Sequence, residues 1–250
     1  MERHRTILVT RPEPGAGKTI SALSAIGLSC VKVPFTEMVA KSINAEFISA
    51  LESSALQIDG IVVTSANALR YAAPNLLRVI ATVPVFAVGD ATAQFARELG
   101  FTKVYSADGN AQDLCALVRA KLLPHCNLIY LCGVTRSDDV ERELHHCAYN
   151  LTTIETYETV KVSQLTHNLQ GIFREQKVDS VLFYSSLSAQ LFAAEYDALN
   201  AGHLSDVNAI FCISQKAKNA LPSTLSGLCI VCPTPRDDEM ISVVRRFYGA

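Results

Sequence analysis

Short apolar runs alternate with amphipathic stretches along nearly the whole chain. Runs such as Ile7–Val9, Ile61–Val63 and Val181–Phe183 are continuously apolar, and each is followed by a polar turn and then by apolar residues at helical spacing. Continuous apolar strands are typical of parallel sheets covered on both faces, and alternating strand and helix patterns are typical of α/β domains. The pattern therefore predicts an α/β protein built on parallel sheets.

The same order of segments occurs twice, which indicates an internal duplication. The strand and turn of DGIVVTSANAL (59–69) are repeated in DSVLFYSSLSA (179–189). Each copy has an acidic residue before an apolar strand that ends in Ser, Thr and small residues. Two further pairs follow in the same order, 83–100 with 208–221 and 106–118 with 231–244. The chain is thus expected to contain two similar domains.

The last pair of segments predicts how the two domains are connected. The first copy ends with the segment 128–157, LIYLCGVTRSDDVERELHHCAYNLTTIETY. The counterpart of this segment is not at the C-terminus but in the N-terminal segment 6–35, and both contain the tripeptide Val-Thr-Arg. We therefore expect a contiguous domain at 37–155, inserted into an outer domain made of 1–34 and 162–250. The crossings, near 33–37 and 155–162, are rich in valine and predict a two-strand β connector. Such thin crossings predict domains that move relative to each other.

Composition and charge narrow the class of protein. The chain is 49% hydrophobic and 18% charged, with a net charge of −2 and no Lys/Arg cluster, which argues against nucleic-acid binding. Mean hydropathy is +0.21, yet no apolar run reaches the ~18–20 residues that span a bilayer. The N-terminal apolar run is too short for a signal peptide. We expect a cytoplasmic protein that does not bind membranes, and the modest surface charge favours a monomer.

Sequence motifs for a metal or a bound cofactor are missing. The eight cysteines are scattered, and the single C-x-x-C, Cys229 and Cys232, lies in an apolar strand pattern where the two side chains point to opposite faces. We interpret the cysteines as reduced structural thiols. No histidine follows a strand, and no G-x-S-x-G, H-E-x-x-H or G-x-G-x-x-G is present. The prediction is therefore no metal and no cofactor.

Polar residues follow almost every expected strand. In open parallel sheets ligands bind beyond the carboxyl ends of the strands, where helix N-termini present free amides. Ser, Thr and Asn are also good N-caps, so capping alone explains any single turn. If all the turns face one cleft between the domains, they form a site for an anionic ligand with many carboxylates. The candidate binding residues are Thr10, Arg11, Ser65, Asn67, Gly89, Thr92, Asn110, Gly133, Arg136, Ser185, Ser214 and Lys216.

The segment TRPEPGAGKT raises a different possibility, a phosphate-binding P-loop. A Walker A loop needs a glycine five positions before its Gly-Lys pair, and this chain has Pro12 there, which has no N–H to donate. A second strand ending in Asp for Mg²⁺ is also missing, because the candidates end in Thr64-Ser65 and Ser185-Ser186. Gly17-Lys18-Thr19 is therefore expected only to start a helix.

One tyrosine is unusual in its place. Tyr157 lies in IETYETV, at a crossing between the domains rather than in a core pattern. Packing is one explanation, but a phenol at that place could donate a proton to a ligand in the cleft.

Taken together, these segments resemble the uroporphyrinogen-III synthase family over essentially the full length. The likeness rests on ILVTRPE, DGIVVTSANAL, FAVGDATAQFARELGF, ADGNAQDLCALV, LCGVTR, IETYETV and DSVLFYSSLSA, in that order and spacing. The family fold, two α/β domains joined by a β-ladder with one domain inserted in the other, agrees with the duplication.

The resemblance implies a reaction and a set of residues. Hydroxymethylbilane, a linear polycarboxylate tetrapyrrole, would be closed to uroporphyrinogen III with ring D inverted and water released, and without cofactor. Tyr157 matches the family tyrosine thought to help the hydroxyl leave, while Ser65, Thr92 and Ser185 match cleft hydroxyls. The chain departs from the family at 214–217, Ser-Gln-Lys-Ala, where many members have a threonine-rich helix start. A transient contact with the preceding enzyme of the pathway is also expected.

Two alternatives remain open at this level. One is a two-domain protein that binds a small molecule and closes over it as a hinged clamp. The other is the P-loop enzyme considered above.

Overall fold

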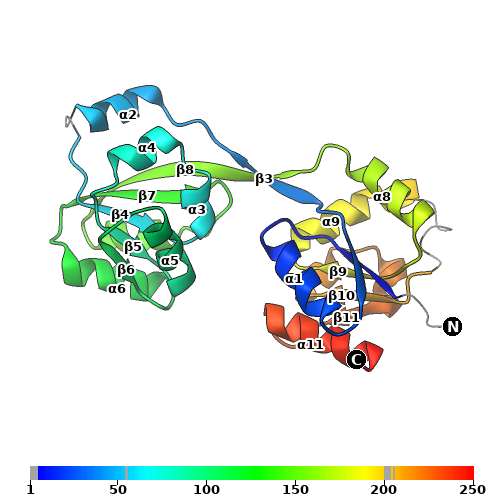
Figure 1. Cartoon of the computed structure of the whole chain (residues 1–250). Helices are drawn as coiled ribbons and strands as arrows, with labels where there is room; N and C mark the ends of the chain where they lie inside the picture. The colour runs from blue at the N-terminus through cyan, green and yellow to red at the C-terminus, as the bar shows by residue number, and fades with distance from the viewer. Residues whose placement is uncertain (1–4, 54–55, 200–203, 205) are drawn as a thin grey trace. The chain divides into compact units, whose positions relative to one another are not determined.

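The computed structural model describes residues 5–53, 56–199, 204 and 206–250. Contacts divide the chain into two compact units, which we call the outer domain (1–37 and 160–250) and the inner domain (38–159). Each has its own sheet with helices on both faces, as Figure 1 shows. The predicted class, two parallel-sheet α/β domains with one inserted in the other, is confirmed.

The outer sheet has the strand order β11-β10-β9-β1-β2, with every neighbouring pair parallel. Its strands are short and apolar, and β1, β9 and β10 are almost completely buried because helices cover both faces. The strands are β1 (Thr6–Val9), β2 (Ser29–Lys32), β9 (Val178–Phe183), β10 (Ala209–Cys212) and β11 (Cys229–Val231). The helices are α1 (Gly15–Ser24), α8 (Leu165–Glu175), α9 (Ser186–Glu195), α10 (Gln215–Asn219) and α11 (Asp237–Tyr248), with 3-10 turns η1 (Asp197–Leu199) and η3 (Ser223–Leu228).

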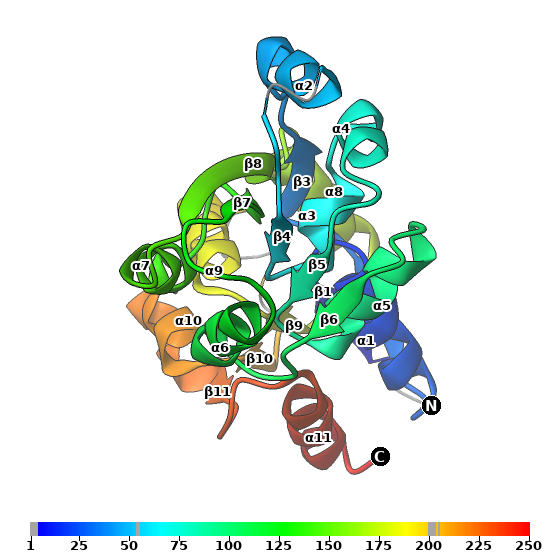
Figure 2. The same ribbon diagram turned by 90° about the vertical axis from the view of Figure 1, so that its left-hand side faces the viewer.

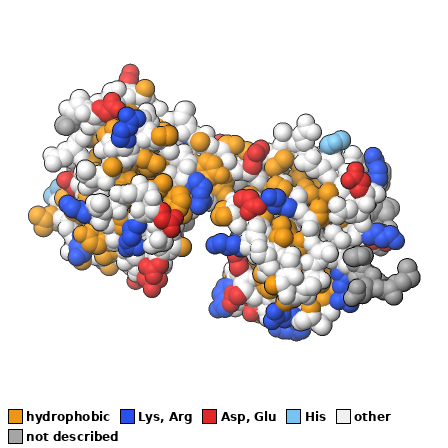
Figure 3. Space-filling model, in the orientation of Figure 1, with side chains coloured by type: hydrophobic (Ala, Val, Ile, Leu, Met, Phe, Trp, Pro, Cys, Tyr) orange, Lys and Arg blue, Asp and Glu red, His pale blue; other side chains and the backbone are white. Residues whose placement is uncertain are grey.

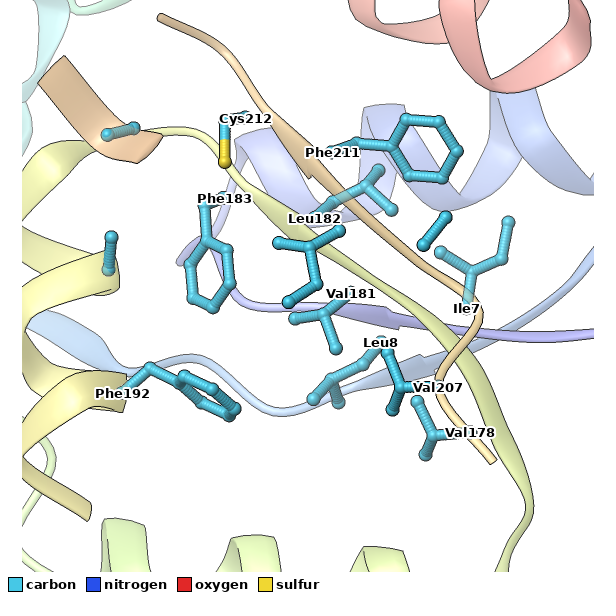
Figure 4. Packing of buried hydrophobic residues seen from close by; sticks show 14 of the residues in the cluster. Ile7, Leu8, Val178, Val181, Leu182, Phe183, Phe192, Val207, Phe211 and Cys212 are labelled. Carbon is cyan, nitrogen blue, oxygen red and sulfur yellow. The ribbon is translucent and has the colours of Figure 1, made fainter. Parts of the chain in front are cut away.

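Aromatic rings from strands and helices fill the outer core. Phe192 of α9 contacts Phe183 at the end of β9, with ring centroids 5.3 Å apart in an edge-to-face arrangement (Figure 4). Phe35 stacks on Phe192 at 6.2 Å, which brings the chain leading to the inner domain into the same core. The carboxyl end of β9 is therefore fixed firmly where its polar turn begins.

The inner sheet has the order β3-β8-β7-β4-β5-β6, and the pairs from β8 to β6 are parallel. Its strands are β3 (Thr36–Ala40), β4 (Gly60–Val63), β5 (Val85–Ala87), β6 (Val104–Ser106), β7 (Asn127–Gly133) and β8 (Asn150–Lys161). Its helices are α2 (Ala45–Glu52), α3 (Ala66–Arg70), α4 (Pro74–Val79), α5 (Asp90–Glu98), α6 (Ala111–Lys121) and α7 (Asp139–His146).

Alternate residues of the inner strands pack into two separate cores. Val62 joins the core under α6 and α7, whereas its neighbours Ile61 and Val63 join the core under α2, α3, α4 and α5. In Figure 2, α6 and α7 lie on one side of these strands and α3, α4 and α5 on the other. Both faces of β4 are thus covered, which explains its unbroken apolar sequence.

The two sheets repeat one strand order. Read from the edge, β11-β10-β9-β1-β2 corresponds to β6-β5-β4-β7-β8, so the N-terminal β1 and β2 occupy the places that β7 and β8 occupy in the inner domain. This is the pairing that the Val-Thr-Arg repeat indicates.

β3 and β8 carry the chain from one domain to the other. They are neighbours, and the bonds Lys41 N–H to Thr156 O (2.9 Å) and Val162 N–H to Phe35 O (3.1 Å) show that they run in opposite directions. The two-strand connector that the sequence predicts is present.

Charged side chains are interspersed rather than segregated on the face shown in Figure 3. No helix among the described residues is long and apolar enough to cross a membrane.

Candidate functional site

Tyr157 lies at the carboxyl end of β7, against the backbone of Gly133. A Cβ atom on Gly133 would stand 2.7 Å from Tyr157 Cζ and 3.0 Å from its hydroxyl, so only glycine leaves room for the ring. The Tyr71 ring lies 5.9 Å away, centroid to centroid. Within the described residues the Tyr157 hydroxyl makes no hydrogen bond, and its side chain is half-buried. The phenol is therefore held in place by its ring and left available to a ligand.

A β-bulge in β8 sets the position of this ring. Cys132 pairs with Glu155 and Gly133 with Tyr157, so Thr156 is an extra residue on the β8 side. Thr156 is buried, and its hydroxyl donates to the carbonyl of Ala68 at 2.8 Å. Because the side-chain period of a strand is two, an extra residue changes the face on which the following side chain lies. The bulge thus places Tyr157 opposite Gly133.

Four of the predicted binding residues cap helices. Each accepts a hydrogen bond from a backbone N–H in the first turn of the helix that follows. A serine hydroxyl that accepts such a bond still has its own proton to donate to a carboxylate, and the Asn amide keeps its NH₂ group. Capping and ligand binding are therefore compatible at Ser65, Asn110, Ser185 and Ser214.

The turn before α5 differs, because it has no side-chain cap. Gly89 is the N-cap residue and has no side chain, so the first amides of α5 point outward without a side-chain acceptor. Thr92, one turn into the helix, is largely buried. Asn67, at the start of α3, uses its NH₂ group toward Met38 Sδ (3.1 Å) and its oxygen toward Arg70 (2.6 Å).

Thr10 has a structural contact. Its side chain is completely buried, and its hydroxyl donates to the carbonyl of Leu182 at 2.7 Å, which ties β1 to β9. In this structure its hydroxyl therefore lies between the two strands. Lys216, the second residue of α10, is by contrast exposed.

Arg11 follows Thr10 and is held by its own domain. Its guanidinium lies over the Tyr184 ring, 4.1 Å from the centroid. Nη1 hydrogen-bonds to Asp237 Oδ2 at 2.9 Å and reaches Thr19 Oγ1 at 3.5 Å. The Thr19 hydroxyl in turn donates to the Tyr184 hydroxyl at 3.2 Å, while burial raises the pKa of Tyr184. A positive charge is thus fixed at the carboxyl end of the outer sheet.

Arg136, the equivalent residue of the inner domain, is bound to two carboxylates. It contacts Glu141 at 2.8 Å and Glu155 at 3.1 Å, and its Nη1 also donates to the carbonyl of Gly133 at 3.0 Å. Burial works against its charge, but the bonds to Glu141 and Glu155 outweigh that effect and raise the pKa of Arg136. The Arg136 guanidinium in turn lowers the pKa of Glu155. A substrate carboxylate would have to compete with both glutamates.

A groove of about 550 Å³ beside β8 contains this cluster. Arg136 and Lys41 line it, but Glu155 pairs with both, at 3.1 and 3.3 Å. Their charges are therefore largely neutralised within the domain.

The segment that suggests a P-loop is an ordinary helix start. Helix α1 begins at Gly15, so Lys18 lies inside its first turn rather than at its beginning. The amide of Gly17, which a phosphate would need, donates to Glu13 Oε2 at 2.9 Å. Glu13 also binds Lys32 at 2.8 Å. The segment binds its own carboxylate and leaves no phosphate cradle.

The sequence patterns did not point to three side chains that support the site. Tyr130 is buried and shares a hydrogen bond of 3.1 Å with Thr64, at the turn after β4, and burial raises its pKa. Tyr184 supports Arg11, and Thr156 forms the bulge. The repeat offered one signal, because Tyr184 follows β9 as Thr64 follows β4.

All eight cysteines are free thiols. Burial raises the pKa of Cys30 to about 11 and that of Cys132 to about 12, which keeps both protonated and unreactive near neutral pH. Among the described residues, no three His, Cys, Asp or Glu side chains are grouped to hold a metal ion.

The family model of Uroporphyrinogen-III synthase HemD matches residues 18–242. The chain belongs to the uroporphyrinogen-III synthase family. The family places it among the enzymes of porphyrin biosynthesis, and the match includes the capped turns, Arg136 and Tyr157.

Solved structures agree with the fold. The uroporphyrinogen-III synthetase of Helicobacter pylori 26695 is similar with a TM-score of 0.62 and 13% identity, over 97% of this chain and 99% of that one. A mutant uroporphyrinogen III synthase of Thermus thermophilus gives a TM-score of 0.54 and 15% identity, over 98% and 99% of the two chains. At such identities the likeness concerns the two-domain architecture.

Proposed function

We propose that this chain closes hydroxymethylbilane to uroporphyrinogen III, with inversion of ring D and release of water, as a lyase that needs no cofactor. The observation that carries the proposal is the family match over residues 18–242. The geometry supports it because a free phenol and several hydroxyl and amide donors lie at the carboxyl ends of parallel strands, where α/β sheets bind ligands.

The chemistry asks the protein for two things. The hydroxyl group of ring A must leave, and the pyrrole nitrogen supplies the electron pair that expels it. Tyr157 donates a proton to that hydroxyl as the C–O bond breaks, so that water departs. Ring D then attacks through its substituted carbon to give a spiro intermediate, which fragments and closes in the inverted sense. The phenolate regains a proton when the pyrrole carbon loses one in the final step.

The second requirement is to hold a flexible polycarboxylate in one conformation. Orientation of this kind can supply a large part of the rate and the selectivity. The hydroxyls of Ser65 and Ser214 have protons to donate, the Ser185 hydroxyl shares a hydrogen bond of 3.0 Å with that of Ser188, and the turn at Gly89 has amides without a side-chain acceptor. We propose that these groups, with Asn110, Arg11 and Lys216, bind the carboxylates. Thr10 and Arg136 support the site from within their domains.

A monomeric state, a cytoplasmic location and a transient contact with the preceding pathway enzyme stay predictions. Size-exclusion chromatography with light scattering tests the first.

The decisive experiment mixes purified protein with freshly prepared hydroxymethylbilane and separates the product isomers by chromatography. We expect uroporphyrinogen III in excess over the I isomer that forms without protein. If only the I isomer forms, at the rate of the protein-free control, the proposed function is wrong.

A matched pair of variants tests the phenol. Tyr157→Phe should lower kcat about a hundredfold, the scale of a lost general acid. Tyr71→Phe removes the hydroxyl of the neighbouring ring and should keep the wild-type rate. Equal rates for Tyr157→Phe and the wild type would remove Tyr157 from the mechanism.

A further inference from the structure

The ion pair between Arg11 and Asp237 joins a fixed residue to an exposed one. The Arg11 side chain is only 22% exposed, whereas that of Asp237 is 62% exposed. Arg11 is therefore packed within the domain, whereas Asp237 contacts it from the surface.

Three contacts fix the guanidinium of Arg11. The side chain crosses Gly15, where an added Cβ would stand 2.3 Å from Nε, so the helix start leaves a path for it. Its charged plane rests on Tyr184, and Thr19 lies within hydrogen-bonding reach. Cation–π stacking and the confined path limit the conformations of the Arg11 side chain. A ligand that binds Arg11 therefore loses less free energy in ordering it.

Asp237 has no comparable support. It is the first residue of α11, and among the described residues its carboxylate hydrogen-bonds to Arg11 alone. The contact is made through one oxygen and through Nη1, although a guanidinium can bind a carboxylate through two parallel bonds. A second carboxylate that reached two of the guanidinium N–H groups would bind Arg11 more strongly than Asp237 does through its single contact.

We propose that Arg11 is a carboxylate-binding site which Asp237 occupies in the resting protein, and that an aliphatic carboxylate arm of the substrate displaces Asp237. The inference deepens the proposed function and rests on it for the identity of the substrate. While Asp237 occupies Arg11, a substrate carboxylate cannot bind there. The apparent affinity of Arg11 for the carboxylate is therefore reduced in proportion to the fraction of molecules in which Asp237 is bound. Asp237 thus tunes how readily a carboxylate arm is bound.

The equivalent arginine shows why the site is in the outer domain. Arg136 is held by two carboxylates, and Glu141 is only 18% exposed. Displacing Glu141 would leave its charge in poor contact with water, which costs more than releasing an exposed aspartate.

The kinetic test uses two adjacent aspartates. Asp237→Asn should lower KM for hydroxymethylbilane about two- to fivefold, the scale of a surface ion pair. Asp238→Asn is the matched control, because Asp238 lies in the same first turn of α11 but pairs with Arg236. It alters the charge at the helix start equally and should leave KM unchanged.

A double mutant shows whether Asp237 acts through Arg11. Arg11→Gln should raise KM, and adding Asp237→Asn to it should change nothing further. A KM for Asp237→Asn equal to the wild-type value, or an equal decrease in Asp238→Asn, overturns the proposal.

A second measurement does not depend on the reaction. The side-chain Nε–H signal of Arg11, assigned by its loss in Arg11→Gln, is followed by NMR while acetate is added. In Asp237→Asn the signal should move at lower acetate concentration than in the wild type and in Asp238→Asn. Equal midpoints, or no movement in any variant, contradict the site. If the wild type makes only the I isomer while the midpoints differ as expected, the carboxylate site stands and the proposed function falls.

Discussion

Arg11 and Arg136 occupy the same position of the repeated tripeptide Val-Thr-Arg, at the same strand end of two sheets with the same strand order. Arg136 is surrounded by Glu141, Glu155 and two backbone carbonyls, whereas Arg11 faces one exposed aspartate. The difference teaches that the neighbours, not the residue type, decide whether an arginine at a strand end is structural or available. We therefore expect Arg136 to stabilise its domain and Arg11 to be the one that binds a ligand.

The two domains also differ in the residue that precedes the Val-Thr-Arg tripeptide. Leu8 precedes it in the outer domain, and Gly133 in the inner one. Gly133→Ala would place a methyl group 2.7 Å from Tyr157 Cζ, so the ring has to move. Because small displacements of a catalytic group are costly, we expect formation of uroporphyrinogen III to slow about a hundredfold.

Gly171→Ala is the control for that variant, since a Cβ there meets nothing within 4 Å and Gly171 lies inside α8. It should keep full activity. Wild-type turnover in Gly133→Ala would show that the position of the Tyr157 ring does not limit the reaction.

The next effect concerns stability. Arg136→Gln leaves Glu141 without its cation and Glu155 with Lys41 alone, and we expect the free energy of unfolding of the inner domain to fall by about 2 kcal/mol. Arg142→Gln removes an exposed arginine of α7 that pairs with Asp138 and Asp139, and should cost less than about 0.5 kcal/mol.

Urea unfolding followed by circular dichroism measures both variants, and Arg11→Gln can be compared in the same way. If Arg11→Gln destabilises its domain as much as Arg136→Gln does, the distinction between the two arginines is wrong.

The middle residue of the tripeptide gives a smaller effect. Thr10 is buried and hydrogen-bonds to Leu182, whereas Thr135 is exposed. Thr10→Val keeps the shape and loses that bond, so we expect a loss of about 1 kcal/mol in the outer domain. Thr135→Val should change almost nothing. Thermal unfolding of the two variants checks this, and equal melting temperatures would contradict the assigned contact.

The smallest effect appears at acid pH. The pKa of Glu195 lies below its usual value of 4.5, because Lys161 at 2.5 Å and Thr166 hydrogen-bond to its carboxylate. Because the pKa of Glu195 is lower in the folded protein than in the unfolded chain, its ionised carboxylate stabilises the folded protein at pH values above the unfolded pKa. This contribution is lost as the pH falls from about 4.5 through the pKa of the folded state.

Glu195→Gln should therefore show a flatter decrease of melting temperature with acid than the wild type does, whereas Glu175→Gln, at the exposed end of α8, should follow the wild type. Parallel curves for all three proteins would mean that Glu195 does not contribute.

The place of the N-terminal segment in the outer domain was predictable, because each segment of one copy matches a segment of the other and 6–35 matches 128–157. The polar turns were also predictable, since Ser65, Asn110, Ser185 and Ser214 have the side chains that both caps and carboxylate sites require. Sequence could not separate those two roles, because a cap and a ligand donor use the same residue types.

Contacts between distant segments were not predictable. Asp237 is 226 residues from Arg11, and their pairing depends on α11 packing beside α1. The bulge at Thr156 could not be predicted from the pattern of polar and apolar residues, because β8 contains many polar residues and one extra threonine does not change that pattern. The contact of the Thr10 hydroxyl with the carbonyl of Leu182 joins segments 172 residues apart and could not be predicted either.

The permuted order of the outer sheet has a consequence during synthesis. β4 to β8 leave the ribosome as one continuous stretch, so the inner sheet can close as soon as residue 161 is available. β1 is made before the inner domain, yet its neighbour β9 ends at Phe183, and most of the core that covers β1 comes after that residue. β1 is therefore paired at most with β2 until the whole inner domain has been synthesised. Because β1 and β9 are far apart along the chain, we expect the outer sheet to form after the inner one.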